Sequence, residues 1–181
     1  MKHIPQIEFR VSWVHNLMFD KNRYLPKQKR DSQKYSPQDG EALSKVNQPF
    51  LKAWRKIEQQ VLSHIPIFTG FHWKDKIIQV YLSDTVPNSY EDPLTLKLDI
   101  PPLRMCFDLI HELVHRNIPS SIQNSLPDAD RERIMDAVTE RIALMLELDV
   151  TTYPLFTVRQ VDLIREELLN KTVRDWIRAN I

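Results

Sequence analysis

Two histidines and a glutamate in one short stretch have the spacing of a metal site. Residues 111–115 read His111-Glu112-Leu113-Val114-His115. On a helix, residues four apart lie one above the other on the same face, so both imidazoles can reach one metal ion. Glu112 lies about 100° round the helix from His111, near enough to reach a metal-bound water without being a ligand. The stretch therefore predicts two metal ligands beside a general base.

A zinc site with an open position needs a third protein ligand. We expect it on the helix predicted over residues 128–148, where Asp136 and Glu140 are four residues apart and share a face. Glu140 is the preferred ligand, and Asp136 would then accept a hydrogen bond from a ligand histidine. The roles of the two acids are exchangeable on this pattern. Alternatively, both are ordinary acids that pair with Arg133 and Arg141.

The elements around the motif predict an α+β fold, in which a small mixed or antiparallel sheet packs on helices. Period-two alternation indicates strands over residues 4–14 and 77–83, and most clearly over 94–100, with one buried and one solvent face. Residues 37–64 are predicted helical with a break or bend at Pro49, and Pro66 and Gly70 are expected to end that segment. Further helices are expected over 103–117, 128–148, 158–170 and 172–181.

The helix over 103–117 is expected to bear two stripes. Leu103, Phe107, Ile110 and Val114 would form its core stripe, and the polar stripe carries His111 and His115. If the polar stripe were simply the solvent face, the histidine spacing would be coincidental. The chain is thus expected to form a single domain over residues 1–181, with the metal-site core over 77–148 and helices over 155–181.

Composition narrows the class of protein. The chain has 181 residues, 42% of them hydrophobic and 27% charged, as in ordinary globular proteins. Its single cysteine, Cys106, cannot form an intrachain disulfide. With two glycines in all, it has no glycine-rich phosphate-binding loop. No apolar leader or membrane-spanning run is present, and we expect a cytoplasmic protein without membrane contact.

Residues 20–36 form a predicted basic, mobile loop. Within it, residues 21–35 carry six basic side chains against one acid, Asp31, although the whole chain has a net charge of +1. A solvated loop is the simpler interpretation, and a nucleic-acid contact is the alternative. Two tyrosines, Tyr24 and Tyr35, are too few to favour base stacking, so we do not expect nucleic acid as a partner.

The motif and the expected helix after it resemble the zincin metallopeptidases, and more narrowly the thermolysin-like gluzincins in their smallest form. The resemblance covers roughly residues 77–148. It implies Zn²⁺ on His111, His115 and Glu140, with Glu112 as general base. It also implies that residues 94–100 are an edge strand that pairs with an extended peptide or protein substrate.

The chain departs from the family pattern at two points. The acid that often follows the ligand glutamate by four residues is replaced by Leu144, and an acid instead precedes it at Asp136. No oxyanion-stabilising residue follows from the pattern. The candidates are Tyr90, Arg104, Arg116 and Tyr153.

The expected function is therefore zinc-dependent hydrolysis of peptide bonds. One alternative is a zinc-binding, non-proteolytic regulatory or interaction protein whose basic loop contacts nucleic acid or a partner. A second alternative is a structural domain without metal. The sequence does not predict the oligomeric state or the cleavage preference.

Overall fold

The computed structural model describes residues 3–11, 48–83, 90–91, 93–98, 100–152 and 163–180. Its sheet has the strand order β1-β2-β4-β3, formed by Gln6–Val11, Ile77–Ser83, Leu94–Lys97 and Tyr90–Glu91 respectively. β2 pairs in parallel with β1 and β4, whereas β3 pairs with β4 in the antiparallel sense. Of the two expected kinds of sheet, the small mixed one is thus confirmed and the antiparallel one is not, and β2 has the predicted bounds. The basic loop over residues 20–36 lies outside the described residues.

The strand predicted over 94–100 is shorter than expected and has a different place in the sheet. β4 ends at Lys97, and its ladder with β3 covers Leu94 and Thr95. β3 therefore lies beyond β4 in the strand order, where the sequence analysis expected an edge. The alternation of leucines correctly predicted a strand. Periodicity shows which face of a strand is buried, but it does not show whether a short neighbouring strand such as β3 pairs with its edge.

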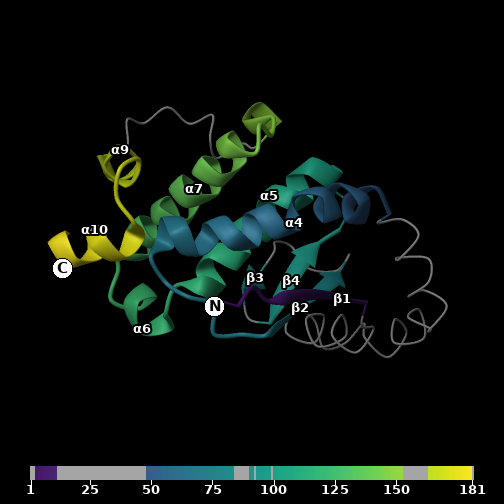
Figure 1. The fold of residues 1–181 in the computed structure, drawn as a ribbon, viewed down its shortest axis with the longest axis horizontal. Helices are drawn as coiled ribbons and strands as arrows, with labels where there is room; N and C mark the ends of the chain where they lie inside the picture. The colour runs from purple at the N-terminus through teal and green to yellow at the C-terminus, as the bar shows by residue number, and fades with distance from the viewer. Residues whose placement is uncertain are drawn as a thin grey trace, which may run out of the picture.

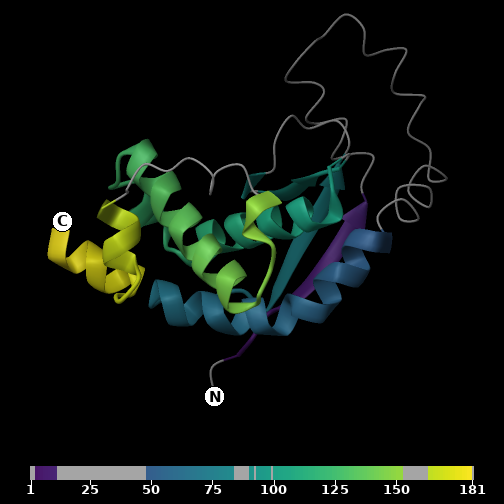
Figure 2. The same ribbon diagram turned by 90° about the horizontal axis from the view of Figure 1, so that it is seen from above.

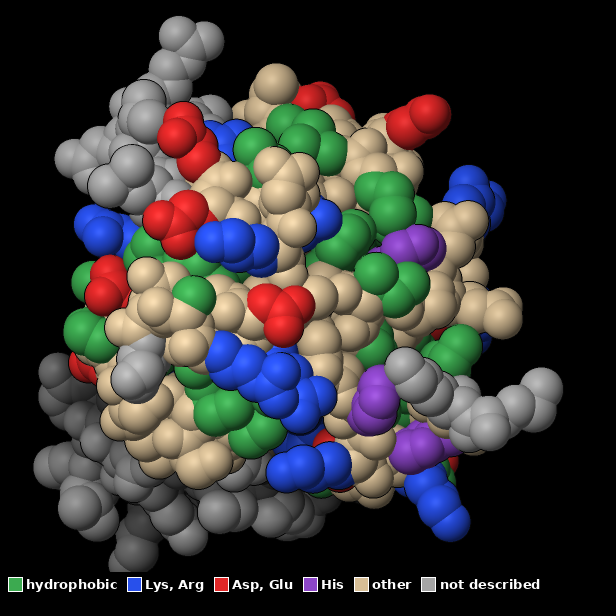
Figure 3. All heavy atoms as spheres, turned by 60° about the vertical axis from the view of Figure 1, so that its left-hand side comes forward, with side chains coloured by type: hydrophobic (Ala, Val, Ile, Leu, Met, Phe, Trp, Pro, Cys, Tyr) green, Lys and Arg blue, Asp and Glu red, His purple; other side chains and the backbone are tan. Residues whose placement is uncertain are grey.

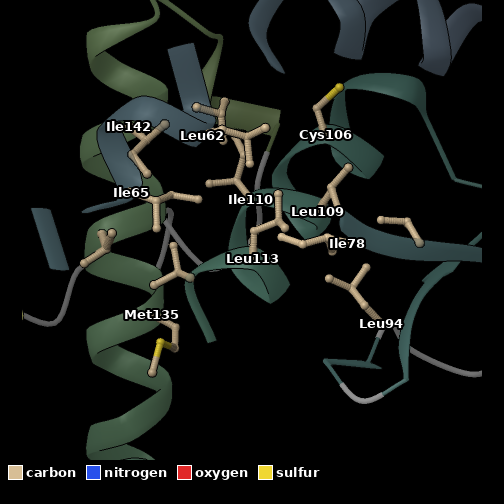
Figure 4. Close-up of a cluster of buried hydrophobic side chains, with 14 of the residues drawn as sticks. Leu62, Ile65, Ile78, Leu94, Cys106, Leu109, Ile110, Leu113, Met135 and Ile142 are labelled. Carbon is tan, nitrogen blue, oxygen red and sulfur yellow. The ribbon is translucent and has the colours of Figure 1, made fainter. Parts of the chain in front are cut away.

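The three long helices gather on one side of the sheet (Figures 1 and 2). They are α4 (Gln48–Thr69), α5 (Pro102–Asn117) and α7 (Asp128–Met145). α5 lies at the centre, since it contacts α4, α7, β3 and β4. Figure 4 shows side chains from these helices meeting the inward side chains of the sheet. The fully buried members of this core include Leu62, Ile65, Ile78, Leu94, Leu109, Ile110, Leu113 and Ile142.

Pro66 does not end α4, contrary to the sequence-based expectation. The helix continues to Thr69, and Gly70 follows with φ of 78°, a left-handed conformation suited to glycine. Because proline has no N–H, Pro66 leaves the carbonyl of Leu62 without its usual helical donor. The indole Nε1 of Trp73 donates to that carbonyl at 2.8 Å. A side chain from the following loop thus replaces the missing backbone hydrogen bond.

Shorter helices complete the described fold. α6 (Ser120–Gln123) links α5 to α7, the 3₁₀ helix η1 spans Val150–Thr152, and α9 (Leu163–Leu168) and α10 (Val173–Asn180) follow. α9 and α10 lie at the end of the molecule away from the sheet (Figures 1 and 2). On that face, basic and acidic side chains are interspersed (Figure 3). Among the described helices, none has the length and apolar character needed to cross a membrane.

Candidate metal centre

The two histidines of the motif lie inside the protein. His111 and His115 are 8% and 6% exposed, on the side of α5 that faces α7. The core stripe lies on another side of the same helix, where Phe107, Ile110 and Val114 are fully buried. The interpretation of the polar stripe as a plain solvent face is therefore excluded for the histidines. Buried imidazoles need polar partners, and the partners found here are two carboxylates and an amide.

The Nε2 atoms of both rings point to one place, where a carboxylate joins them. The two Nε2 atoms are 3.1 Å apart. Oε2 of Glu132, from the first turns of α7, lies 3.4 Å from His111 Nε2 and 3.5 Å from His115 Nε2. His111, His115 and Glu132 form a group of side chains in the described structure that could hold a metal ion.

These separations fit a single ion. Nitrogen and oxygen ligands placed 2.0–2.2 Å from a tetrahedral zinc are about 3.4 Å from one another. The three observed separations, from 3.1 to 3.5 Å, are close to that value. Two nitrogens and one oxygen also leave a fourth position for water or substrate. The residues present therefore fit a metal ion with an open coordination position.

Gln123 fixes the orientation of His115. Its Oε1 accepts a hydrogen bond from His115 Nδ1 at 2.9 Å, which leaves the lone pair of Nε2 directed at the site. Its Nε2 donates to the carbonyls of His115 and Ile118 at 2.7 and 2.9 Å. One buried amide thus caps the end of α5 and sets the tautomer of a ligand. Gln123 could not be predicted from the sequence pattern, because its position on α6 depends on how the chain folds back after α5.

Asp136 holds the other histidine. Its Oδ1 lies 3.1 Å from His111 Nδ1, the contact that the sequence analysis expected for an outer partner of a ligand. Burial disfavours the charged form of His111, but Asp136 and Glu132 favour it more strongly. The pKa of the metal-free ring is consequently raised to about 10. The contacts of Glu132 with His111 and, to a smaller extent, with His115 hold the pKa of the Glu132 carboxyl well below its usual range.

Glu140, the predicted third ligand, lies elsewhere. Its carboxylate pairs with Arg165 of α9, and burial is the main cause that raises its pKa. The contacts of His111 with Asp136 and of His115 with Glu132 show that α5 and α7 are antiparallel. Glu140 is eight residues beyond Glu132, about 12 Å further along the helix. The structure therefore brings Glu132, not Glu140, to the histidines.

The arginines of the alternative interpretation have other contacts as well. Arg141 donates to the carbonyls of Leu168 and Lys171, and its guanidinium lies 4.2 Å from the Phe68 ring centroid. Arg133 lies 3.4 Å from Asp130.

The remaining candidates are placed as follows. Arg104 pairs with Asp108 at 2.9 Å, and Arg116 pairs with Asp75 at 2.8 Å. Cys106 is fully buried, and burial raises the pKa of its thiol to about 12, as expected for a core residue. Tyr153 and the side chain of Tyr90 lie outside the described part of the structure.

Comparisons with known proteins identify no relative. No protein-family profile, no curated protein and no solved structure matches this chain. The function is therefore inferred from the geometry of the site itself.

Proposed function

We propose that this protein is a zinc-dependent peptidase whose metal ligands are His111, His115 and Glu132. The observation that carries the proposal is the convergence of two Nε2 atoms and one carboxylate oxygen at 3.1 to 3.5 Å from one another. A site with two histidines and a glutamate leaves an open position, as zinc peptidases require. The outer contacts with Asp136 and Gln123 support it, because ligand histidines are commonly held in this way.

Glu112 is the proposed general base. It follows His111 directly on α5 and is partly buried. Its negative charge contributes to the raised pKa of His111. Zinc at the site would supply an electrophile that polarises the scissile carbonyl and lowers the pKa of a bound water. The Glu112 carboxylate would accept the proton from that water and deliver it to the leaving nitrogen.

The proposal keeps the resemblance to the gluzincins but changes the third ligand. The proposed glutamate ligand is on a second helix, as in that group, but it is Glu132. A peptide pairing with strand 94–100 also remains a proposal. Since β3 already pairs with Leu94 and Thr95, such pairing would use the rest of that strand or displace β3.

The test is hydrolysis of a peptide library by the metal-loaded chain and by Glu112→Gln. This variant should bind zinc as the parent does and lose about 10²- to 10⁴-fold in kcat/KM, the usual contribution of a general base. Glu166→Gln, an exposed change on α9, is the matched control. Full activity of Glu112→Gln would overturn the mechanism.

A further inference from the structure

A polar pocket adjoins the proposed metal centre on the far side of His115. It has a volume of about 290 Å³, the size of a site for a small group, and His115 forms part of its wall. The rest of the wall comes from the loop before β2, with Lys74 and Asp75, from the end of α5, with Arg116 and Asn117, and from residues 118–120 and Gln123. Of the three proposed metal ligands, His115 is the one that forms part of this wall.

The charge of the wall favours an anion. Lys74 and Arg116 are cationic and Asp75 is the acid among the lining residues, which leaves one positive charge in excess when His115 is neutral. Arg116 donates to Asp75 through Nε, at 2.8 Å. This contact fixes the guanidinium plane without using its two terminal nitrogens, which have no hydrogen-bond partner among the described residues. An anchored guanidinium of this kind suits the two oxygens of a carboxylate.

A second observation concerns Asn117 in the same wall. It is 5% exposed, and its Oδ1 accepts a hydrogen bond from Thr69 Oγ1 at 2.5 Å. Its Nδ2 has no acceptor among the described residues. Buried amide donors normally have one, so Nδ2 of Asn117 is an unsatisfied donor beside the pocket. An acceptor atom of a bound ligand would satisfy it.

Arg116 also leads out of the pocket. A second hollow, of about 350 Å³, lies over the outer face of the sheet and is lined by Ile77, Tyr81, Leu94 and Arg116 among others. Because Arg116 belongs to both walls, the hollows meet at this side chain. A chain whose carboxylate is bound in the first hollow could continue across the sheet in the second.

We propose that the pocket beside His115 binds a carboxylate of the substrate through Arg116 and Lys74, so that the enzyme prefers peptides with a negative group next to the scissile bond. This inference rests on the proposed peptidase function. The carboxylate has two sources, an acidic side chain within a peptide or the free C-terminus. The first would make the enzyme an endopeptidase for acidic sequences, and the second a carboxypeptidase.

The test is a binding titration that does not depend on turnover. The full-length Glu112→Gln variant is loaded with zinc and titrated with each of three probes. NMR chemical shifts of the protein report the binding. N-acetylglutamine offers only the α-carboxylate, N-acetylglutamate α-amide offers only the side-chain carboxylate, and N-acetylglutamine amide is neutral. One of the carboxylate probes should bind at least about 10-fold more tightly than the neutral probe, as for a charge-assisted contact.

Two variants assign the effect to the pocket. Replacing Lys74 and Arg116 together by Gln should bring the ratio of carboxylate to neutral affinity close to one. Asp75→Asn keeps the guanidinium and removes the competing acid, so the ratio should stay or rise. If the Arg116–Asp75 pair had only a structural role, Asp75→Asn and Arg116→Gln would act alike.

Equal affinity for all three probes would overturn the proposal, and so would a carboxylate preference that survives loss of both cations. Failure of the peptidase function gives a different result. In that case no peptide is cleaved by the zinc-loaded parent, whereas the carboxylate preference in the binding titration remains.

Discussion

Asp136 provides the sharpest quantitative test of how the metal site is built. Its Oδ1 lies 3.1 Å from His111 Nδ1 as an ion-pair contact, and neither atom has a hydrogen-bond partner among the described residues. Asp136→Ala would leave a buried ring donor unsatisfied, at a cost of about 1–3 kcal/mol. Asp136→Asn would keep an acceptor and remove only the charge. We expect zinc affinity to fall about 10-fold in the Asn variant and about 100-fold in the Ala variant.

Proton competition acts against this loss and must be separated from it. Asp136 also helps to raise the pKa of metal-free His111 to about 10, so removing it makes the ring easier to deprotonate. This easier deprotonation raises the zinc affinity of the variants, and the effect is larger at lower pH. The affinity loss should therefore be larger at about pH 8.5 than at about pH 6.5.

The assay is competition with a chromophoric chelator at both pH values, with circular dichroism to confirm folding. Asp130→Asn is the matched control, since Asp130 is on the same helix but lies 3.4 Å from Arg133 rather than at the site. If the Asn and Ala variants bind zinc as tightly as the parent at both pH values, Asp136 does not support the ligand and the reasoning is refuted.

Three further predictions concern the same fold. Trp73→Phe should lower the free energy of unfolding in urea by about 1–2 kcal/mol, because it removes the donor to the Leu62 carbonyl. In a Pro66→Ala background, where the helix regains its own donor, the cost should shrink, and an equal cost would contradict this account. The Cys106 thiol, buried with a pKa of about 12, should react with a thiol reagent at about pH 8 only after unfolding, so rapid labelling of the native chain would count against its burial. Zinc binding at about pH 7 should release about one proton, because the raised pKa of His111 keeps the metal-free ring protonated at that pH. Calorimetry in buffers of different ionisation enthalpy measures the number of protons released. Binding without proton release would contradict this ionisation state of His111.

Much of the local structure could be predicted from sequence because it follows from periodicity. The strand over 77–83 and the helix over 103–117 agree with β2 and α5 to within a residue. Their apolar residues recur at periods of two and of three to four, which sets the buried face without reference to the rest of the fold. The histidine pair follows from the same helical spacing.

What depends on tertiary arrangement could not be predicted in the same way. Glu132, Asp136 and Glu140 share one face of α7 at four-residue spacing, but only Asp136 and Glu140 were predicted as candidate ligands. Which of them meets the histidines is decided by how far α6 brings the start of α7 back along α5. The continuation of α4 through Pro66 likewise depends on Trp73, which is close only after folding.

The central claim is that His111, His115 and Glu132 hold one metal ion, and metal content tests it most directly. The parent chain should bind one zinc per molecule, measured by mass spectrometry under native conditions. Glu132→Gln should lose it or bind it far more weakly, whereas Glu140→Gln, whose carboxylate pairs with Arg165, should retain it. Zinc binding that survives Glu132→Gln and is abolished by Glu140→Gln would contradict the account.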